Sequence, residues 1–180
     1  MYYGRIHNRF LDAARDLAPA RILDVGCGTG ELLVKCAHRW PKAELVGVDL
    51  SRSMLAQARA KSWGKRRPAL KEANVYDLPF ARGAFDLVFN SISSHFYRDG
   101  KRAFSELGRV TAPGGHFYQA SLGNGLLRFV PGPWKDHLLI PSAVYRAPGE
   151  QSTLLKKAGF EVQRVSRHFG NTWLYECRRN

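Results

Sequence analysis

Short apolar runs alternate along the chain with segments whose apolar residues recur every three or four positions. Residues 21–25 and 43–48 are the clearest runs, and both favour β-strands. The segment between them, residues 31–40, has apolar residues at helical spacing: Leu32, Leu33, Cys36 and Ala37. A strand, a glycine-rich turn, a helix and a second strand in this order predict a βαβ unit with a right-handed crossover.

The same alternation continues toward the C-terminus. Ser51 is a good N-cap for a second helix, and strands are expected at residues 69–75, 85–89 and 116–120. Residues 98–110 have helical spacing. An opening helix is also expected, with an apolar face formed by Ile6, Phe10, Ala14 and Leu17.

The last third of the chain changes character. Residues 122–147 are rich in Gly, Pro and aromatic residues, and we expect an irregular insertion there that acts as a lid or lines an acceptor pocket. A short helix at 152–158 and two strands at 160–166 and 172–177 follow, the strands being joined around Gly170. The chain is therefore expected to form one α/β domain over residues 1–180. Its fold is a doubly wound, mostly parallel, seven-stranded sheet with an antiparallel strand at the C-terminal end.

Composition supports an ordered protein without cross-links. The chain has 180 residues, 44% hydrophobic and 24% charged, which excludes disordered, collagen-like and coiled-coil classes. Its 3 cysteines are scattered without metal-ligand or disulfide spacing, so we expect reduced thiols, a cytoplasmic location and no metal site. No apolar run approaches the length of a membrane span.

Positive charge is in excess, with 28 Lys and Arg against 15 Asp and Glu and a formal net charge of +13. Such a charge favours polyanions such as nucleic acid or anionic lipid. The densest stretch, residues 59–67, holds five basic residues and Trp63. It is interpreted either as a solvated helix end or as a surface on which Trp63 contacts lipid headgroups or an exposed base.

Residues 23–30, which read LDVGCGTG, carry the most information about function. A strand enters this loop, three glycines at alternate positions let a ligand approach the backbone, and a helix leaves it. A dinucleotide fingerprint would place its third glycine at position 31, where this chain has Glu31. Asp24 and Glu31 would repel a pyrophosphate and attract positive centres.

Asp49 follows the second predicted strand, where a carboxylate can accept hydrogen bonds from ribose hydroxyls. A nucleoside with a cationic tail and no phosphate satisfies both the acidic loop and this carboxylate. S-adenosylmethionine is such a molecule.

Five sequence blocks in order resemble the class I S-adenosylmethionine-dependent methyltransferases. They are residues 23–30, 46–51, 74–80, 85–88 and 109–115. Within this class, residues 78–80, 109–115 and 158–162 are most similar to the small-molecule branch that contains the ubiquinone and menaquinone C-methyltransferases.

The resemblance implies roles for particular residues. The implied cofactor-binding set is Asp24, Gly26, Cys27, Gly28, Gly30, Asp49, Leu50, Asn74, Val75 and Ser91. Asp24 would receive the cofactor's ammonium group, with satisfaction by backbone N–H groups as the alternative. Asn74 stands where the family usually has Asp, and it can still accept from the adenine amino group without charge assistance.

His95 is the candidate general base, because an imidazole can deprotonate a phenol, a hydroxyl or an activated carbon. The alternative is a half-exposed structural histidine at the start of a helix. His7 and Tyr3 are expected to close over the cofactor from the first helix. The segment around His95 lacks the Asp/Asn-Pro-Pro-aromatic motif of enzymes that methylate base amino groups.

The sequence therefore predicts methyl transfer to a small, aromatic or lipophilic acceptor. The alternatives are an RNA-directed methyltransferase and a non-catalytic S-adenosylmethionine-binding adaptor. Weak contact with an anionic membrane surface is expected, and nucleic acid is the less favoured partner. The acceptor atom and the oligomeric state stay open.

Overall fold

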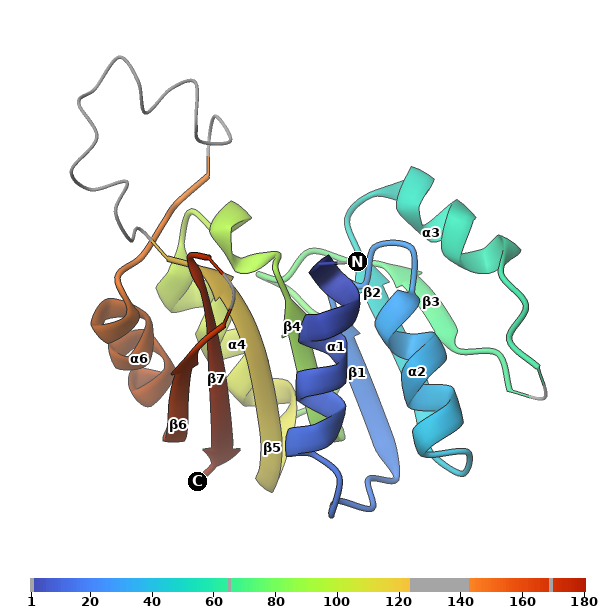
Figure 1. Cartoon of the computed structure of the whole chain (residues 1–180), viewed down its shortest axis with the longest axis horizontal. Helices are drawn as coiled ribbons and strands as arrows, with labels where there is room; N and C mark the ends of the chain where they lie inside the picture. Colours follow the sequence, from blue (N-terminus) through green and yellow to red (C-terminus); the bar gives the residue numbers. More distant parts are fainter. Residues whose placement is uncertain (1, 65, 124–142, 169) are drawn as a thin grey trace.

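A seven-stranded sheet forms the centre of the molecule (Figure 1). The computed structural model describes residues 2–64, 66–123, 143–168 and 170–180. Most of the predicted insertion at 122–147 lies outside the described residues. The strands are β1 (Arg21–Val25), β2 (Glu44–Asp49), β3 (Ala69–Glu72), β4 (Phe85–Ser91), β5 (Thr111–Leu122), β6 (Phe160–Arg167) and β7 (Thr172–Arg179).

The strand order is β3-β2-β1-β4-β5-β7-β6. The pairs from β3 to β5 are parallel, whereas β7 runs antiparallel to both of its neighbours, β5 and β6. The predicted fold class is confirmed, including the antiparallel strand near the C-terminus.

Helices cover both faces of the sheet (Figure 1). They are α1 (Tyr2–Ala13), α2 (Glu31–Arg39), α3 (Arg52–Ala60), the 3₁₀ helix η1 (Ser94–Phe96), α4 (Gly100–Val110) and α6 (Pro148–Lys157). Side chains alternate between the faces along each strand, so Ile22 packs with α1 and α2 while Leu23 packs with α4. The buried strands are apolar on both faces for this reason.

Three boundaries differ from the sequence expectation by three residues or more. β3 ends at Glu72 because Asn74 begins a turn, in which its side-chain oxygen accepts a hydrogen bond from the N–H of Tyr76. β5 begins at Thr111 because Gly114, with φ of 74°, keeps the chain in the strand through a local irregularity. α6 begins at Pro148, a residue favoured in the first helical turn.

Within the described ranges, no helix is both long enough and apolar enough to cross a membrane.

Candidate active site at the carboxyl edge of the sheet

The glycine-rich loop folds over the ends of β1 and β2. The N–H groups of Gly26 and Cys27 both donate to the carbonyl of Val48, at 2.8 and 3.0 Å. Gly26, Gly28 and Gly30 have φ of 75°, 53° and 78°, a conformation that disfavours other residues. The glycines at alternate positions in the sequence are therefore explained by the left-handed backbone conformation that the loop adopts at each of them.

Each of the three glycines meets a different environment. A Cβ at Gly26 would lie 2.5 Å from Ser93 Oγ, and one at Gly30 would lie 3.0 Å from the ring of Trp63. A Cβ at Gly28 would meet no atom within 4 Å. The loop is thus fixed from two sides and leaves the backbone at Gly28 open to a ligand.

Asp49, at the end of β2, is joined to this loop. Its Oδ2 accepts from the N–H of Gly28 at 2.8 Å, and its Oδ1 accepts from the N–H of Ser51 at 2.8 Å. A carboxylate oxygen has more than one acceptor position, so both oxygens can still accept from hydroxyl groups. Ser51 caps α3 through its own hydroxyl, as predicted, and Asp49 fixes the residue before that helix.

Asp24 is the most unusual group at this edge. It is 2% exposed, and its Oδ1 is buried without a hydrogen-bond partner among the described residues. Burial, followed by the charge of Asp49, raises the pKa of Asp24 to about 8. The alternative in which backbone N–H groups satisfy this carboxyl leaves Oδ1 unexplained, because no described group donates to that oxygen.

The predicted adenine residues lie in the connection between β3 and β4. Asn74 Oδ1 already accepts from the N–H of Tyr76 at 3.1 Å and keeps one further acceptor position. Asn74 also pairs with Asp77 in an isolated bridge, which folds the connection back on itself. The side chain of Val75 is buried in the core on the α4 face.

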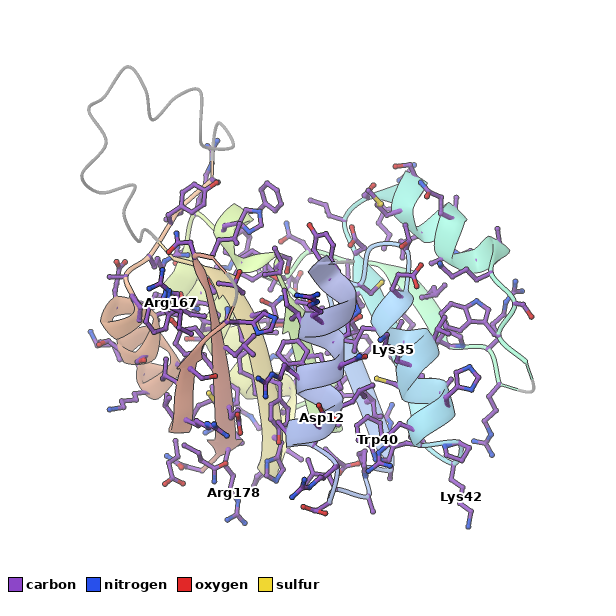
Figure 2. The ribbon with its side chains drawn as sticks, in the orientation of Figure 1. Asp12, Lys35, Trp40, Lys42, Arg167 and Arg178 are labelled. Carbon is purple, nitrogen blue, oxygen red and sulfur yellow. The ribbon has the colours of Figure 1, made fainter. Side chains whose placement is uncertain are left out.

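His7 on α1 contacts Ser91 at the end of β4, with 3.2 Å between Nε2 and Oγ. Burial and the nearby charge of Lys35 lower the pKa of His7 to about 4, so its imidazole is neutral at pH 7. Figure 2 shows Lys35 between α2 and α1, and its Nζ donates to the carbonyl of Gly4 at 3.5 Å. α1 therefore reaches the site through His7.

His95 lies in η1 and is 3% exposed. The half exposure that the structural alternative assumed is wrong, because the side chain is buried; a structural role for this histidine stays an alternative to the catalytic one. Its Nδ1 is buried without a partner in the described part of the chain, and burial lowers its pKa, which favours the neutral form. Its ring lies 4.1 Å from that of Phe96 and 6.3 Å from that of Tyr145, between centroids.

A buried polar cluster behind the glycine loop was not predicted. Asn90 Nδ2 lies 2.8 Å from the carbonyl of Val25, 2.6 Å from Ser93 Oγ and 2.8 Å from the hydroxyl of Tyr97. Asn90 ends an otherwise apolar stretch of β4, and a buried amide in such a run was the available signal. Ser93 lies so near Gly26 that no Cβ fits there, so this cluster supports the loop.

The chain just after residue 142 is attached to the His95 segment. The N–H of Val144 donates to the carbonyl of His95 at 2.6 Å. The buried guanidinium of Arg146 donates to the carbonyls of Ser94 and Tyr97, at 3.4 and 2.5 Å. Arg146 also forms a backbone bridge with Gly123, so both described ends of the predicted insertion meet beside η1.

The side chain of Trp63 is buried, so the interpretation in which it contacts lipid headgroups or an exposed base is wrong. Its ring is buried against Gly30, and its Nε1 donates to the carbonyl of Ala58 at 3.0 Å. Arg66 and Arg67 are exposed and donate to the carbonyls of Lys42 and Arg59. Lys65 lies outside the described residues.

The arrangement fits S-adenosylmethionine on two observations of the site itself. The unpartnered Asp24 oxygen suits a positively charged group, and the open side of Gly28 next to Asp49 suits a ribose. Leu50, at the mouth between β2 and α3, is exposed. Cys27 is buried in the loop, and burial raises its pKa, so its thiol is unreactive.

Comparison with known proteins agrees with this geometry. Residues 22–115 match the model of a methyltransferase domain. A malonyl-[acyl-carrier protein] O-methyltransferase of Legionella pneumophila is 41% identical over 118 residues, which are 66% of this chain and 42% of that protein. A demethylmenaquinone methyltransferase of Thermus thermophilus is 39% identical over 130 residues, 72% of this chain and 56% of that protein. The chain thus spans about half the length of these curated relatives.

Solved structures share the fold. An S-adenosylmethionine-dependent methyltransferase from Mesorhizobium loti superposes with a TM-score of 0.76 at 23% identity, covering 88% of this chain and 90% of that one. A geranyl diphosphate C-methyltransferase from Streptomyces coelicolor superposes with a TM-score of 0.79 at 18% identity, covering 98% and 79%. The fold and the glycine loop define the class I methyltransferase architecture. This chain belongs to the methyltransferase domain family, whose cofactor, S-adenosylmethionine, is the one that its sequence motifs indicate.

Proposed function

We propose that this chain transfers a methyl group from S-adenosylmethionine to a small, apolar or aromatic acceptor. The observation that carries the cofactor assignment is the buried, unpartnered carboxyl oxygen of Asp24 beside an open glycine backbone. When bound, S-adenosylmethionine supplies a methyl group that an acceptor nucleophile takes by in-line displacement. Catalysis then rests largely on orientation and on the exclusion of water.

Each residue of the site has its own role in binding the cofactor or in accepting the proton. Asp49 binds the ribose hydroxyls, Asp24 binds the ammonium group, and Asn74 with the N–H of Val75 binds the adenine. Ser91, held by His7, contacts the cofactor from the end of β4. His95, whose neutral form is favoured by burial, accepts the proton that the acceptor loses.

The apolar acceptor is supported by the rim of the site. Four of the exposed large apolar side chains belong to elements that meet the carboxyl edge of the sheet (Figure 1): Tyr3, Leu50, Met54 and Phe96. Such a group of exposed apolar side chains is typical of a binding site for an apolar ligand. The acceptors named for the two sequence relatives differ in chemistry, so the rim and not the relatives supports this choice.

Two further properties belong to the proposal. Buried, unpaired cysteines favour a reducing compartment such as the cytoplasm. The net charge of +13 favours weak contact with an anionic membrane surface, where a lipophilic acceptor would be dissolved.

One assay tests the function against its alternatives. The purified chain is incubated with S-adenosylmethionine and either a small-molecule extract or total RNA, and S-adenosylhomocysteine is measured. We expect product with the extract. Product with RNA alone would establish an RNA-directed enzyme, and binding without product from either source would establish an adaptor.

A further inference from the structure

The connection between β3 and β4, residues 73–84, carries the proposed adenine residues but contains no described helix or strand longer than an isolated bridge. Its conformation therefore depends on its own turn hydrogen bonds and on contacts with neighbouring elements. α4, on the sheet face opposite α1 and α2, supplies them (Figure 1).

One ion pair of α4 makes most of these contacts. Glu106 Oε1 accepts from the N–H of Leu78 at 2.8 Å. Arg109 donates to the carbonyls of Leu78 and Phe80, at 2.9 and 2.6 Å. The two side chains are also joined to each other through both oxygens of Glu106, at 2.7 and 2.6 Å. Three backbone groups of the connection are thus fixed by two side chains one helical turn apart.

This pair differs from the other ion pairs of the described residues. It is the one in which both side chains are less than a third exposed, at 28% for Arg109 and 15% for Glu106. Exposed pairs such as Arg52–Glu72 contribute little, because solvent screens them. A partly buried Arg–carboxylate pair with two parallel hydrogen bonds has a defined geometry.

The opposite end of the same helix contacts the same connection. Asp99, the N-cap of α4, donates its N–H to the hydroxyl of Tyr76 at 3.2 Å. Arg102 lies 5.6 Å above the ring of Tyr76. Since Asp77 donates its N–H to the carbonyl of Asn74 at 3.0 Å, contacts at Tyr76 and Leu78 are transmitted to Asn74 over a short stretch of chain.

We propose that the Glu106–Arg109 pair positions the connection so that Asn74 and Val75 distinguish adenine from other purines. The inference rests on the proposed function. Adenine presents an amino donor to the oxygen of Asn74, whereas hypoxanthine presents a carbonyl acceptor at the same place. A binding site built for a donor rejects the analogue that lacks it, provided that its own groups are held accurately.

The experiment compares two ligands on four proteins. Affinities for S-adenosylhomocysteine and for S-inosylhomocysteine are measured by calorimetry on the wild type, Glu106→Gln, Arg109→Lys and Glu44→Gln. The last variant is a matched control. Glu44 pairs with Arg21 through two hydrogen bonds, and Arg21 also donates to a backbone carbonyl, as Arg109 does. The Glu44–Arg21 pair lies at the opposite edge of the sheet, where β1 and β2 begin. Circular dichroism and melting temperature establish that each variant is folded.

We expect the wild type and Glu44→Gln to prefer S-adenosylhomocysteine by a factor of about 10 or more. Arg109→Lys keeps the charge but loses the forked geometry, so its preference should fall to about threefold or less, through weaker binding of the adenine ligand. Glu106→Gln keeps an acceptor for Leu78 and should show a smaller fall.

The failures are distinguishable. A wild type that binds neither ligand overturns both the proposed function and this inference. A wild type that binds both equally overturns the adenine assignment and the inference with it. Folded variants that keep the wild-type preference, or that lose both ligands in the same proportion, overturn the inference alone.

Discussion

The two halves of the sheet's carboxyl edge are built differently. The half formed by β1, β2 and β3 is a backbone site, in which N–H groups and carboxylates are arranged by a loop with three left-handed glycines. The half formed by β4 and β5 is a side-chain site, in which His95 lies among aromatic rings close to Phe96 and Tyr145. The same edge of the sheet thus offers carboxylates and backbone N–H groups on one side and aromatic rings around His95 on the other.

This difference explains why one half carries a strong sequence signature. A backbone site needs particular residues, because its φ values favour glycine and a Cβ at Gly26 would collide with Ser93. A side-chain site can be built from many combinations of aromatic and aliphatic residues. The identity of the cofactor is therefore easier to predict from the sequence than the identity of the acceptor.

The largest expected effect is on the half formed by β4 and β5, which we propose binds the acceptor. His95→Ala should lower turnover about 10²–10⁴-fold, because the acceptor proton loses its base, while S-adenosylhomocysteine affinity stays within about threefold. Turnover and calorimetry are measured in parallel once an acceptor is found.

His116→Ala is the control for this change. Its Nδ1 is also buried without a described partner, and burial also lowers its pKa, but it lies in β5 opposite Leu87 of β4 and not in η1. If turnover in His95→Ala falls by less than about threefold, His95 has a packing role and is not the general base.

The next effect is on the half formed by β1, β2 and β3, which we propose binds the cofactor and call the cofactor half. Asp49→Ala should weaken S-adenosylhomocysteine binding by about 1–3 kcal/mol, because charge-assisted hydrogen bonds to the ribose are lost. Calorimetry on the folded variant measures this change.

Asp86→Ala is the matched control, since Asp86 also accepts from two backbone N–H groups, those of Ala20 and Arg21, at the opposite edge of the sheet. Equal affinities for the two variants would remove the ribose assignment.

A third effect depends on pH and separates the two acids of the cofactor half. With a pKa raised to about 8, Asp24 is mostly protonated at pH 7 and must lose its proton to bind a cation as a carboxylate. S-adenosylhomocysteine affinity should therefore rise up to about tenfold per pH unit below that pKa. Calorimetry at pH 7 in buffers of different ionisation enthalpy should show close to one proton released.

Asp24→Asn should abolish this proton release. The ligand-free protein supplies an independent check. Because the folded state binds the Asp24 proton more tightly than the unfolded state, the free energy of unfolding should fall as pH rises from 3.8 toward about 8. Denaturant titrations on the wild type and Asp24→Asn measure that slope, and an equal slope in both would contradict the assignment.

The smallest effect concerns the basic surface. We expect weak binding to anionic vesicles at low salt, weaker binding to structured RNA, and a decrease of about 1 kcal/mol in vesicle binding for each of Arg66→Ser and Arg67→Ser. Vesicle sedimentation and a gel-shift assay measure the two partners, with neutral vesicles as the control. No binding to either polyanion would show that these arginines are a solvated surface.

The sequence predicted the sheet and the glycine loop because both depend on local rules. Strands buried on both faces read as apolar runs, and the left-handed turns require glycine at fixed positions. The same rules failed at Trp63, which lies among cations in the sequence but packs on Gly30 through a tertiary contact. The hydrogen bonds by which Asn90 supports the glycine loop, and those by which Arg146 holds the His95 segment, were also not predictable. Their partners are distant in sequence.

The described ends of the segment from Gly123 to Arg146 are fastened to each other and to the rest of the fold. Gly123 exchanges backbone and side-chain hydrogen bonds with Asn171, and Arg146 is anchored in the carbonyls beside His95. These anchoring contacts are made by residues outside positions 124–142, so substitutions between the anchors leave the attachment of both ends to the fold in place.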